Sequence, residues 1–214
     1  MLVPLGSIEQ HGPHLPLDTD IRIATAVANA VAEGLGAATL VAPPLPYGAS
    51  GEHQGFAGTI SIGTDALTVV LVEYGRSACE WATRLVFING HGGNLDALRA
   101  AVGLLRTEGR DVAWWGCSVD GGDAHAGHTE TSVLLHLSPA EVQIGEIRPG
   151  NTESLADILP QLRSGGVGAV SPTGVLGDPT TATAESGERI FDDMVAQARA
   201  RIGRWQPNRG GMLT

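Results

Sequence analysis

Short buried strands alternate with amphipathic helices along the chain, and this alternation limits the possible folds more than any other feature. The expected strands lie at residues 1–5, 39–42, 84–88 and 112–115. Apolar residues recur at helical spacing at residues 21–35, 64–81, 94–107, 129–137 and 184–205. Strand–helix–strand units favour a mainly parallel sheet with helices on both faces. The sequence therefore predicts an α/β fold, a three-layer α/β/α domain with a mainly parallel central sheet. A single domain over residues 1–214 suits the length.

In such sheets, functional groups collect at the carboxyl ends of the strands. Glu9 and His11 follow the first expected strand, His91 follows the third, and residues 121–125 follow the fourth. We therefore expect three loops that are rich in metal-ligand residue types to lie along one edge of the sheet. The remaining long segments are rich in Gly, Pro and Thr, and we expect them to form ordered loops over that edge. They are residues 44–63 and 138–183.

The first of these loops carries an acid and an imidazole two residues apart, Glu9 and His11. In an extended backbone such side chains point the same way, so both can reach one metal ion. Asp20 lies at the beginning of the next expected helix, where the helix dipole favours a carboxylate. An aspartate at that position can also serve only as a helix cap, and this alternative stays open.

The second loop, residues 87–94, ends a strand in Asn-Gly and presents His91 between glycines. The glycines permit sharp turns and a close approach of another group to the backbone. A glycine pair before a helix can alternatively form an anion-binding turn. The glycine spacing of a nucleotide-binding loop is absent, so a metal ligand is the favoured interpretation.

The third loop, residues 123–132, contains His125, His128 and Glu130 at the beginning of an expected helix. Alone, it would indicate a capping carboxylate and solvent-exposed histidines. Together, the three loops supply carboxylates and imidazoles without thiolates, which suits Zn, Mn or Fe(II) in a catalytic site. A carboxylate such as Asp20 can bridge two metals, and such a pair, roughly 3.5 Å apart, can activate a water and polarise a carbonyl.

Composition excludes several other functions. All thirteen basic residues are arginine, which leaves no lysine for a Schiff base or a Walker-type phosphate site. The formal net charge of −10 argues against nucleic acid or an anionic membrane as the main partner. Cys79 and Cys117 are far apart and predict neither a zinc knuckle nor a disulfide framework. No apolar run has the ~20 residues of a membrane helix and no signal-peptide pattern is visible, so we expect a cytoplasmic protein.

At the three loops the sequence resembles the creatininase family of metal-dependent amidohydrolases. The matching motifs occur in the family's order and cover most of the chain: GSIEQHG at residues 6–12, TD at 19–20, NGHGGN at 89–94, HAG and ETS within 125–132, and GVLGDP at 174–179. The resemblance implies a creatininase-like fold. Within the family, residues 47–54, 125–139 and 211–214 look most like the peptidase subgroup of mycofactocin biosynthesis.

The resemblance implies an activity and its partners. We expect a dinuclear metal-dependent peptidase that acts on a radical-SAM-modified precursor peptide and releases its C-terminal Val-Tyr-derived dipeptide. Two divalent ions are expected per chain, Fe²⁺ and Zn²⁺ with Mn²⁺ as an alternative, together with a homo-oligomer such as a hexameric ring. Two alternatives remain: hydrolysis of a small cyclic amide or formamide, and a non-catalytic metal-binding scaffold.

The same resemblance assigns the site residues. The expected ligands are Glu9, Asp20 and His91 for one metal and His11, Asp20 and Glu130 for the other. In creatininase the last carboxylate comes from two residues after the motif histidine, which is Gly93 here, so Glu130 is expected to replace it. Glu130 is also an expected catalytic residue. His125 matches the family's histidine near the scissile bond and is expected to orient the substrate or to transfer a proton.

Other residues near the motifs are weaker candidates. Many relatives carry Glu where this chain has His128, which either tunes specificity or faces solvent. Tyr47, Phe56, Trp114 and Trp115 are candidates for an apolar wall of the pocket. For the two tryptophans, packing in the core or at an interface is the favoured interpretation.

Overall fold

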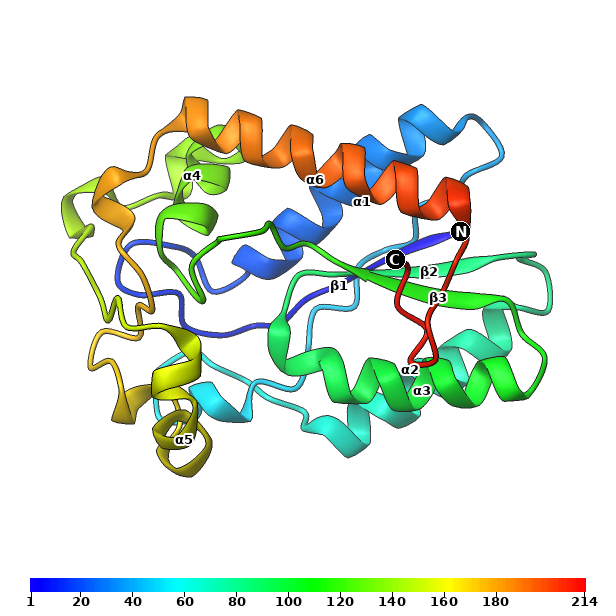
Figure 1. Ribbon diagram of the computed structural model, residues 1–214, viewed down its shortest axis with the longest axis horizontal. Helices are drawn as coiled ribbons and strands as arrows, with labels where there is room; N and C mark the ends of the chain where they lie inside the picture. The colour runs from blue at the N-terminus through cyan, green and yellow to red at the C-terminus, as the bar shows by residue number, and fades with distance from the viewer.

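A parallel sheet lies at the centre of the molecule in the computed structural model, which describes residues 1–214 (Figure 1). Strands β1 (Leu2–Leu5), β2 (Leu85–Asn89) and β3 (Val112–Gly116) lie in the order β1-β2-β3, and both pairs are parallel. Every residue of β1 and β2 is buried because helices cover both faces of the sheet. The predicted α/β class with a parallel sheet is confirmed.

The helices form two layers, one on each face of this sheet. They are α1 (Thr19–Leu35), α2 (Thr64–Ala78), α3 (Leu95–Thr107), α4 (His128–Leu137), α5 (Leu155–Gly165) and α6 (Ala184–Arg204). Val86 and Ile88 of β2 pack in one buried cluster with α1, α4 and α6, whereas Leu85 and Phe87 pack in another with α2 and α3. Alternate residues of a strand point to opposite faces, which produces the three predicted layers.

The expected strand at residues 39–42 does not form. The Leu2 N–H donates to Leu40 O at 2.8 Å, and the Ala42 N–H donates to Leu2 O at 2.9 Å, so the segment runs beside β1. Pro43 and Pro44 follow and have no N–H to donate, so the hydrogen-bond ladder is interrupted and resumes only at Leu45, whose N–H donates to Pro4 O at 2.9 Å. What remains is two isolated parallel bridges, one of them between Leu2 and Val41.

The C-terminal segment covers the opposite edge of the sheet. The Trp114 N–H donates to Gly211 O at 2.9 Å, and the Leu213 N–H donates to Trp114 O at 2.9 Å. The indole N–H of Trp114 also donates to Gly210 O at 2.7 Å. These bonds pair the exposed edge of β3, which would otherwise be open to association with another chain.

Helix α5 lies within residues 138–183, which the sequence predicted to be loop. It begins at a good cap, because the Ser154 hydroxyl accepts a hydrogen bond from the Asp157 N–H. Ile158 then packs in a small separate cluster with Val167 and Leu176. The prediction of a loop was wrong here because one buried side chain per helix gives almost no apolar periodicity, and Pro160 lies inside the helix.

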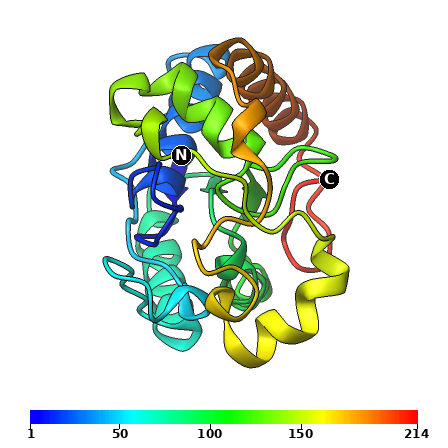
Figure 2. The same cartoon turned by 90° about the vertical axis from the view of Figure 1, so that its left-hand side faces the viewer.

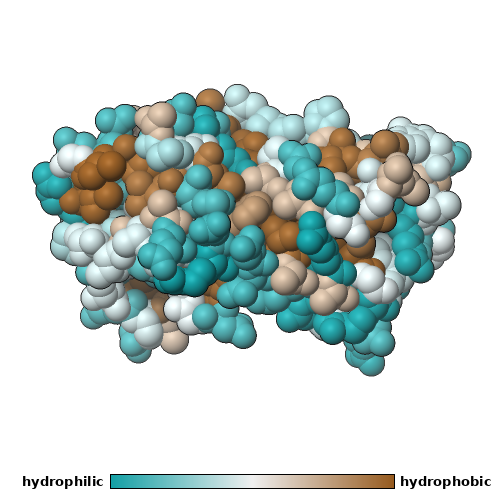
Figure 3. All heavy atoms as spheres, turned by 90° about the horizontal axis from the view of Figure 1, so that it is seen from above, coloured by the Kyte–Doolittle hydropathy of each residue, from teal (hydrophilic) through white to brown (hydrophobic).

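All three strands point their carboxyl ends toward the left of Figure 1, where α5 and the long connections gather. Figure 2, seen from that end, shows segments from the whole length of the chain meeting there. The two faces of the sheet, in contrast, are covered regularly by the long helices. On the α1 and α6 side, hydrophobic atoms reach the surface in several separate places rather than in one continuous patch (Figure 3). No helix combines the length and apolarity required to cross a bilayer.

Candidate metal centre

Five of the six predicted site residues are buried at the carboxyl edge of the sheet. They are Glu9, His11, Asp20, His91 and His125, and the sixth, Glu130, is half-buried in the first turn of α4. Two glycines allow the beginning of α1 to reach the strand ends. A Cβ on Gly6 would lie 2.7 Å from the Ile21 backbone nitrogen, and one on Gly90 would lie 2.4 Å from Asp20 O. The close approach of α1 brings the carboxylate of Asp20 between the first two loops.

Glu9, Asp20 and His91 form one group of close ligand atoms. His91 Nδ1 lies 3.1 Å from Glu9 Oε2 and 3.4 Å from Asp20 Oδ2. On its other side, His91 Nε2–H donates to Ala49 O at 3.2 Å. When the ring is neutral, this bond leaves Nδ1 without a proton and facing the carboxylates, as a metal ligand requires.

His11, His125 and Glu130 form a second group of close ligand atoms. His11 Nε2 lies 3.0 Å from Asp20 Oδ1 and 3.9 Å from Glu130 Oε2. His11 Nδ1–H donates to Glu9 O at 3.1 Å, which again leaves the other nitrogen free to bind. Asp20 thus presents one carboxylate oxygen to each group, which is the arrangement of a bridging ligand.

Three buried carboxylate oxygens at this centre have no hydrogen-bond partner: both oxygens of Glu9 and Oδ2 of Asp20. Buried polar atoms are normally paired, and buried charges require a counterion. Burial and the neighbouring charge of Glu9 raise the pKa of Asp20 to about 7. Burial opposes ionisation of His91, yet Glu9 and Asp20 hold its pKa well above its usual range. The site therefore calls for positive charge, and its oxygen and imidazole donors fit divalent cations.

A buried network that the sequence did not predict supports Glu9. His53 Nε2 lies 3.2 Å from Glu9 Oε1. The Gln10 side-chain amide donates to His53 Nδ1 at 2.8 Å and to Gly174 O at 3.2 Å. Burial and the neighbouring His125 lower the pKa of His53 to about 2, so the ring is neutral. The only sequence signal for His53 was its place in the family motif at residues 47–54.

The predicted catalytic residue His125 lies beside this network. Its Nε2–H donates to Gln10 O at 2.7 Å, which leaves Nδ1 without a proton, 3.7 Å from Glu9 Oε1. Burial and the neighbouring His11 lower the pKa of His125. The neutral ring can therefore accept a proton at Nδ1.

Gly93 has no room for a side chain. A Cβ there would lie 2.3 Å from Ala49 O, 2.4 Å from His91 Nε2 and 2.5 Å from Glu52 Oε1. Glu52 itself approaches the outer nitrogen of His91, with Oε1 at 3.4 Å from Nε2. The sequence analysis did not predict Glu52 either, because this residue reaches the centre from a loop that is distant along the chain.

A cavity of about 490 Å³ opens onto the centre. Its polar wall includes Glu52, His53, His125 and Glu130, and α5 contributes Leu155, Leu159 and Leu162. None of the four aromatic candidates lines this cavity, and packing in the core, the favoured interpretation for the two tryptophans, is confirmed. Tyr47 is exposed and Phe56 packs against the α5 cluster, whereas Trp114 and Trp115 are buried in the cores on opposite faces of the sheet. His128 hydrogen-bonds to Thr181 at 2.8 Å and does not line the cavity.

Known proteins are similar to this chain in sequence and in fold. The family profile for creatininase, described as creatinine amidohydrolase, matches residues 1–202. The chain is 65% identical over 218 residues to the mycofactocin precursor peptide peptidase of Mycolicibacterium smegmatis, and the match covers 100% of this chain and 88% of that protein. It is 31% identical over 229 residues to the creatinine amidohydrolase of Pseudomonas putida, which covers 90% of this chain and 84% of that protein. A solved structure named "Creatininase Mn" superimposes with a TM-score of 0.76 at 29% identity, covering 96% of this chain and 91% of the other.

Proposed function

This chain belongs to the creatininase family, and we propose that it is a metal-dependent peptidase of mycofactocin biosynthesis. It would hydrolyse an amide bond of the radical-SAM-modified precursor peptide and release the C-terminal Val-Tyr-derived dipeptide. The full-length identity of 65% to a precursor peptide peptidase supports the substrate class. The observation that carries the chemistry is the position of Asp20, whose two oxygens face the two groups of ligand atoms.

Each group would hold one divalent ion. Glu9, Asp20 and His91 would bind the first, and His11, Asp20 and Glu130 would bind the second. Fe²⁺ and Zn²⁺ are the ions we propose, with Mn²⁺ as an alternative that a related creatininase structure supports. When bound, such a pair activates water and polarises the amide carbonyl.

Two residues of the chain would act on the substrate directly. His125 would accept and return a proton at Nδ1, because its Nε2–H is already committed to Gln10 O. The Glu130 Oε2 accepts a hydrogen bond from the Ala126 N–H at 2.6 Å, which orients the carboxylate toward His11. Since both side chains line the cavity, a bound peptide can contact them.

The leucines of α5 give the cavity an apolar side opposite the metal centre. Such a wall suits the aromatic and aliphatic side chains of the released dipeptide and excludes water from the reacting amide. We also propose that the protein functions as a homo-oligomer, on the expectation from the family.

Mass spectrometry of the products tests the activity. The metal-loaded protein is incubated with the radical-SAM-processed precursor peptide, and release of the C-terminal dipeptide is the expected result. Creatinine and a formamide serve as comparison substrates. Faster turnover of either would favour a small-amide hydrolase, and metal binding without any hydrolysis would favour a scaffold.

The metal assignment is tested separately with Glu9→Gln and His91→Ala. Both changes remove a donor from the first group and are expected to reduce the bound metal, measured by elemental analysis, as well as turnover. If metal content and turnover both survive these changes, the proposed ligands are wrong.

A further inference from the structure

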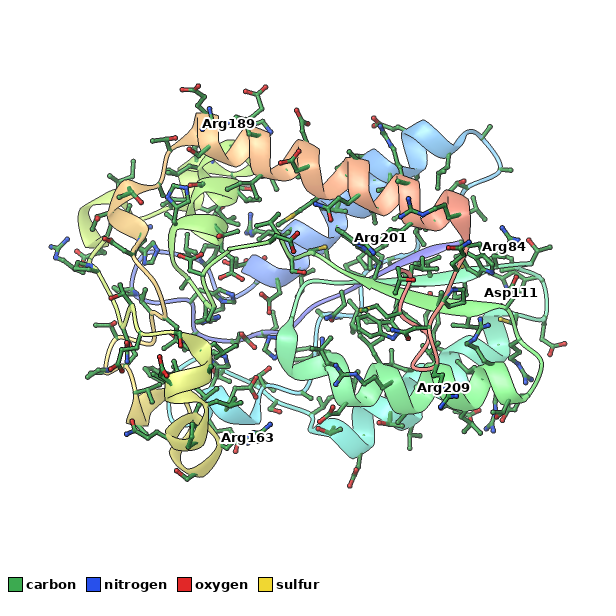
Figure 4. All side chains as sticks on the ribbon, viewed as in Figure 1. Arg84, Asp111, Arg163, Arg189, Arg201 and Arg209 are labelled. Carbon is green, nitrogen blue, oxygen red and sulfur yellow. The ribbon has the colours of Figure 1, made fainter.

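Several arginines without partners line the proposed active-site cavity or the cavities that adjoin it. Nine of the thirteen arginines form an ion pair or a hydrogen bond within the chain. The other four do not, and they are Arg163, Arg201, Arg204 and Arg209. Three of these four line cavities near the metal centre. Figure 4 shows Arg163 on α5, Arg201 on α6 and Arg209 on the C-terminal segment.

These cavities adjoin the active-site cavity or one another. A second cavity of about 340 Å³ shares His91, Leu95 and Arg99 with it and continues between α3 and α6 to Arg201. A third cavity shares Arg99 and Met212 with the second and reaches Arg209. We call this extension, from Arg99 past Arg201 to Arg209, the arginine groove.

The charge of the groove contrasts with that of its surroundings. The chain has a formal net charge of −10, yet the only carboxylate that lines the groove is that of Asp120, which is exposed. A neighbouring cavity of about 570 Å³, which shares Gly90, Gly92, Cys117 and Ser118 with the second cavity, is lined by four carboxylates and no arginine: Asp123, Glu130, Glu153 and Asp178. A substrate that extends into both cavities therefore meets opposite potentials in them.

We propose that the arginine groove binds a carboxylate-bearing segment of the peptide substrate. Arg201 is half-buried and has no partner in the chain, so a substrate carboxylate would complete its hydrogen bonding. Leu95 and Met212, which are half-buried, supply apolar contact surface in the groove. The proposal rests on the proposed peptidase function and adds an orientation, because the acidic part of the peptide lies on the side of α3 and α6.

The test measures binding and cleavage in parallel. Fluorescence anisotropy follows binding of the precursor peptide carrying a fluorophore, and product analysis gives KM and kcat. Arg201→Gln combined with Arg209→Gln is expected to raise both Kd and KM about tenfold or more, because charge-assisted hydrogen bonds are lost. The kcat is expected to stay within about twofold, since neither arginine reaches the reacting amide.

Arg204→Gln is the matched control, because Arg204 also lies near the end of α6 without a partner but lines neither the active-site cavity nor the arginine groove. It should bind the peptide as the unchanged protein does. Arg201→Lys should recover part of the affinity, which would separate charge from packing. The proposal is overturned if the double variant and the Arg204 variant have equal Kd values.

Peptide variants identify the carboxylate. In one peptide variant the acidic side chains of the precursor are converted to amides, and in another its C-terminus is converted to a carboxamide. One of these two peptides should bind the unchanged protein more weakly than the original peptide does. The same peptide and the original peptide should have equal Kd values for the double variant. If neither peptide variant binds more weakly, the inference fails. Anisotropy reports binding separately from product formation. Tight and arginine-dependent binding with no hydrolysis would therefore contradict only the proposed peptidase function.

Discussion

At the scale of single residues, Gly93 stands where the resemblance to creatininase leads one to expect a ligand carboxylate. The space that its side chain would fill is taken by Ala49 O, His91 Nε2 and Glu52. Gly93→Ala is therefore expected to displace His91 and to lower the free energy of unfolding by about 1–3 kcal/mol, as overpacking does. Urea unfolding measures the stability, and titration with Zn²⁺ measures the metal affinity.

Gly92→Ala is the matched control for this change. A Cβ on Gly92 meets no atom within 4 Å, so the variant should unfold and bind metal like the unchanged protein. Equal behaviour of the two variants would show that the loop adapts freely, and that Gly93 does not hold His91 in place.

The predicted residues of the centre were those whose place follows from local rules. Glu9, His11 and His91 follow directly after strands, and parallel strands end at one edge. His53 and Glu52 could not be predicted in the same way. They belong to a loop with no expected element of its own, and they reach the centre only because that loop packs over the sheet edge. The same limit applies to the hydrogen bond between Gln10 and His53, which depends on two separate loops.

At the scale of elements, α5 is the helix with the weakest support, although it forms one wall of the active-site cavity. It buries only Ile158 and contains Pro160. Ser154→Ala removes its cap and is expected to destabilise the helix by about 1 kcal/mol. Hydrogen exchange should show faster exchange in α5 with little change in β2. Ser164→Ala, near the other end of α5, should leave exchange unchanged, and equal effects of the two changes would contradict the capping role.

Elements with a strong apolar pattern were predicted and those without it were missed. Helix α1 buries a full stripe of small and branched apolar residues, and its predicted span agrees with the observed one within two residues. Residues 39–42 look like a strand because they are apolar, but their pairing depends on hydrogen bonds that Pro43 and Pro44 cannot supply. Local composition thus shows that the segment lies beside the sheet, and the backbone donors decide whether it becomes a strand.

At the scale of the whole molecule, the centre joins elements from both halves of the chain. The ligand groups come from the loops after β1 and β2 and from the beginnings of α1 and α4. A metal bound there would link these elements, so its removal should lower the stability of the entire fold. Chelation is expected to lower the free energy of unfolding, by about 2.7 kcal/mol if the free metal had been 100-fold above its dissociation constant. Urea unfolding with and without chelator measures the difference.

Asp20→Asn distinguishes a bridging ligand from a helix cap. In the metal-free protein, Asp20 and Glu9 are buried carboxylates whose mutual repulsion contributes to the raised pKa of Asp20. The asparagine variant should therefore be at least as stable as the unchanged protein without metal, and added Zn²⁺ should stabilise it much less. A simple cap would give the opposite pattern, because the loss of a favourable charge at the beginning of α1 lowers stability by the same amount with or without metal. Equal losses of unfolding free energy with and without metal would therefore show that Asp20 is not a metal ligand.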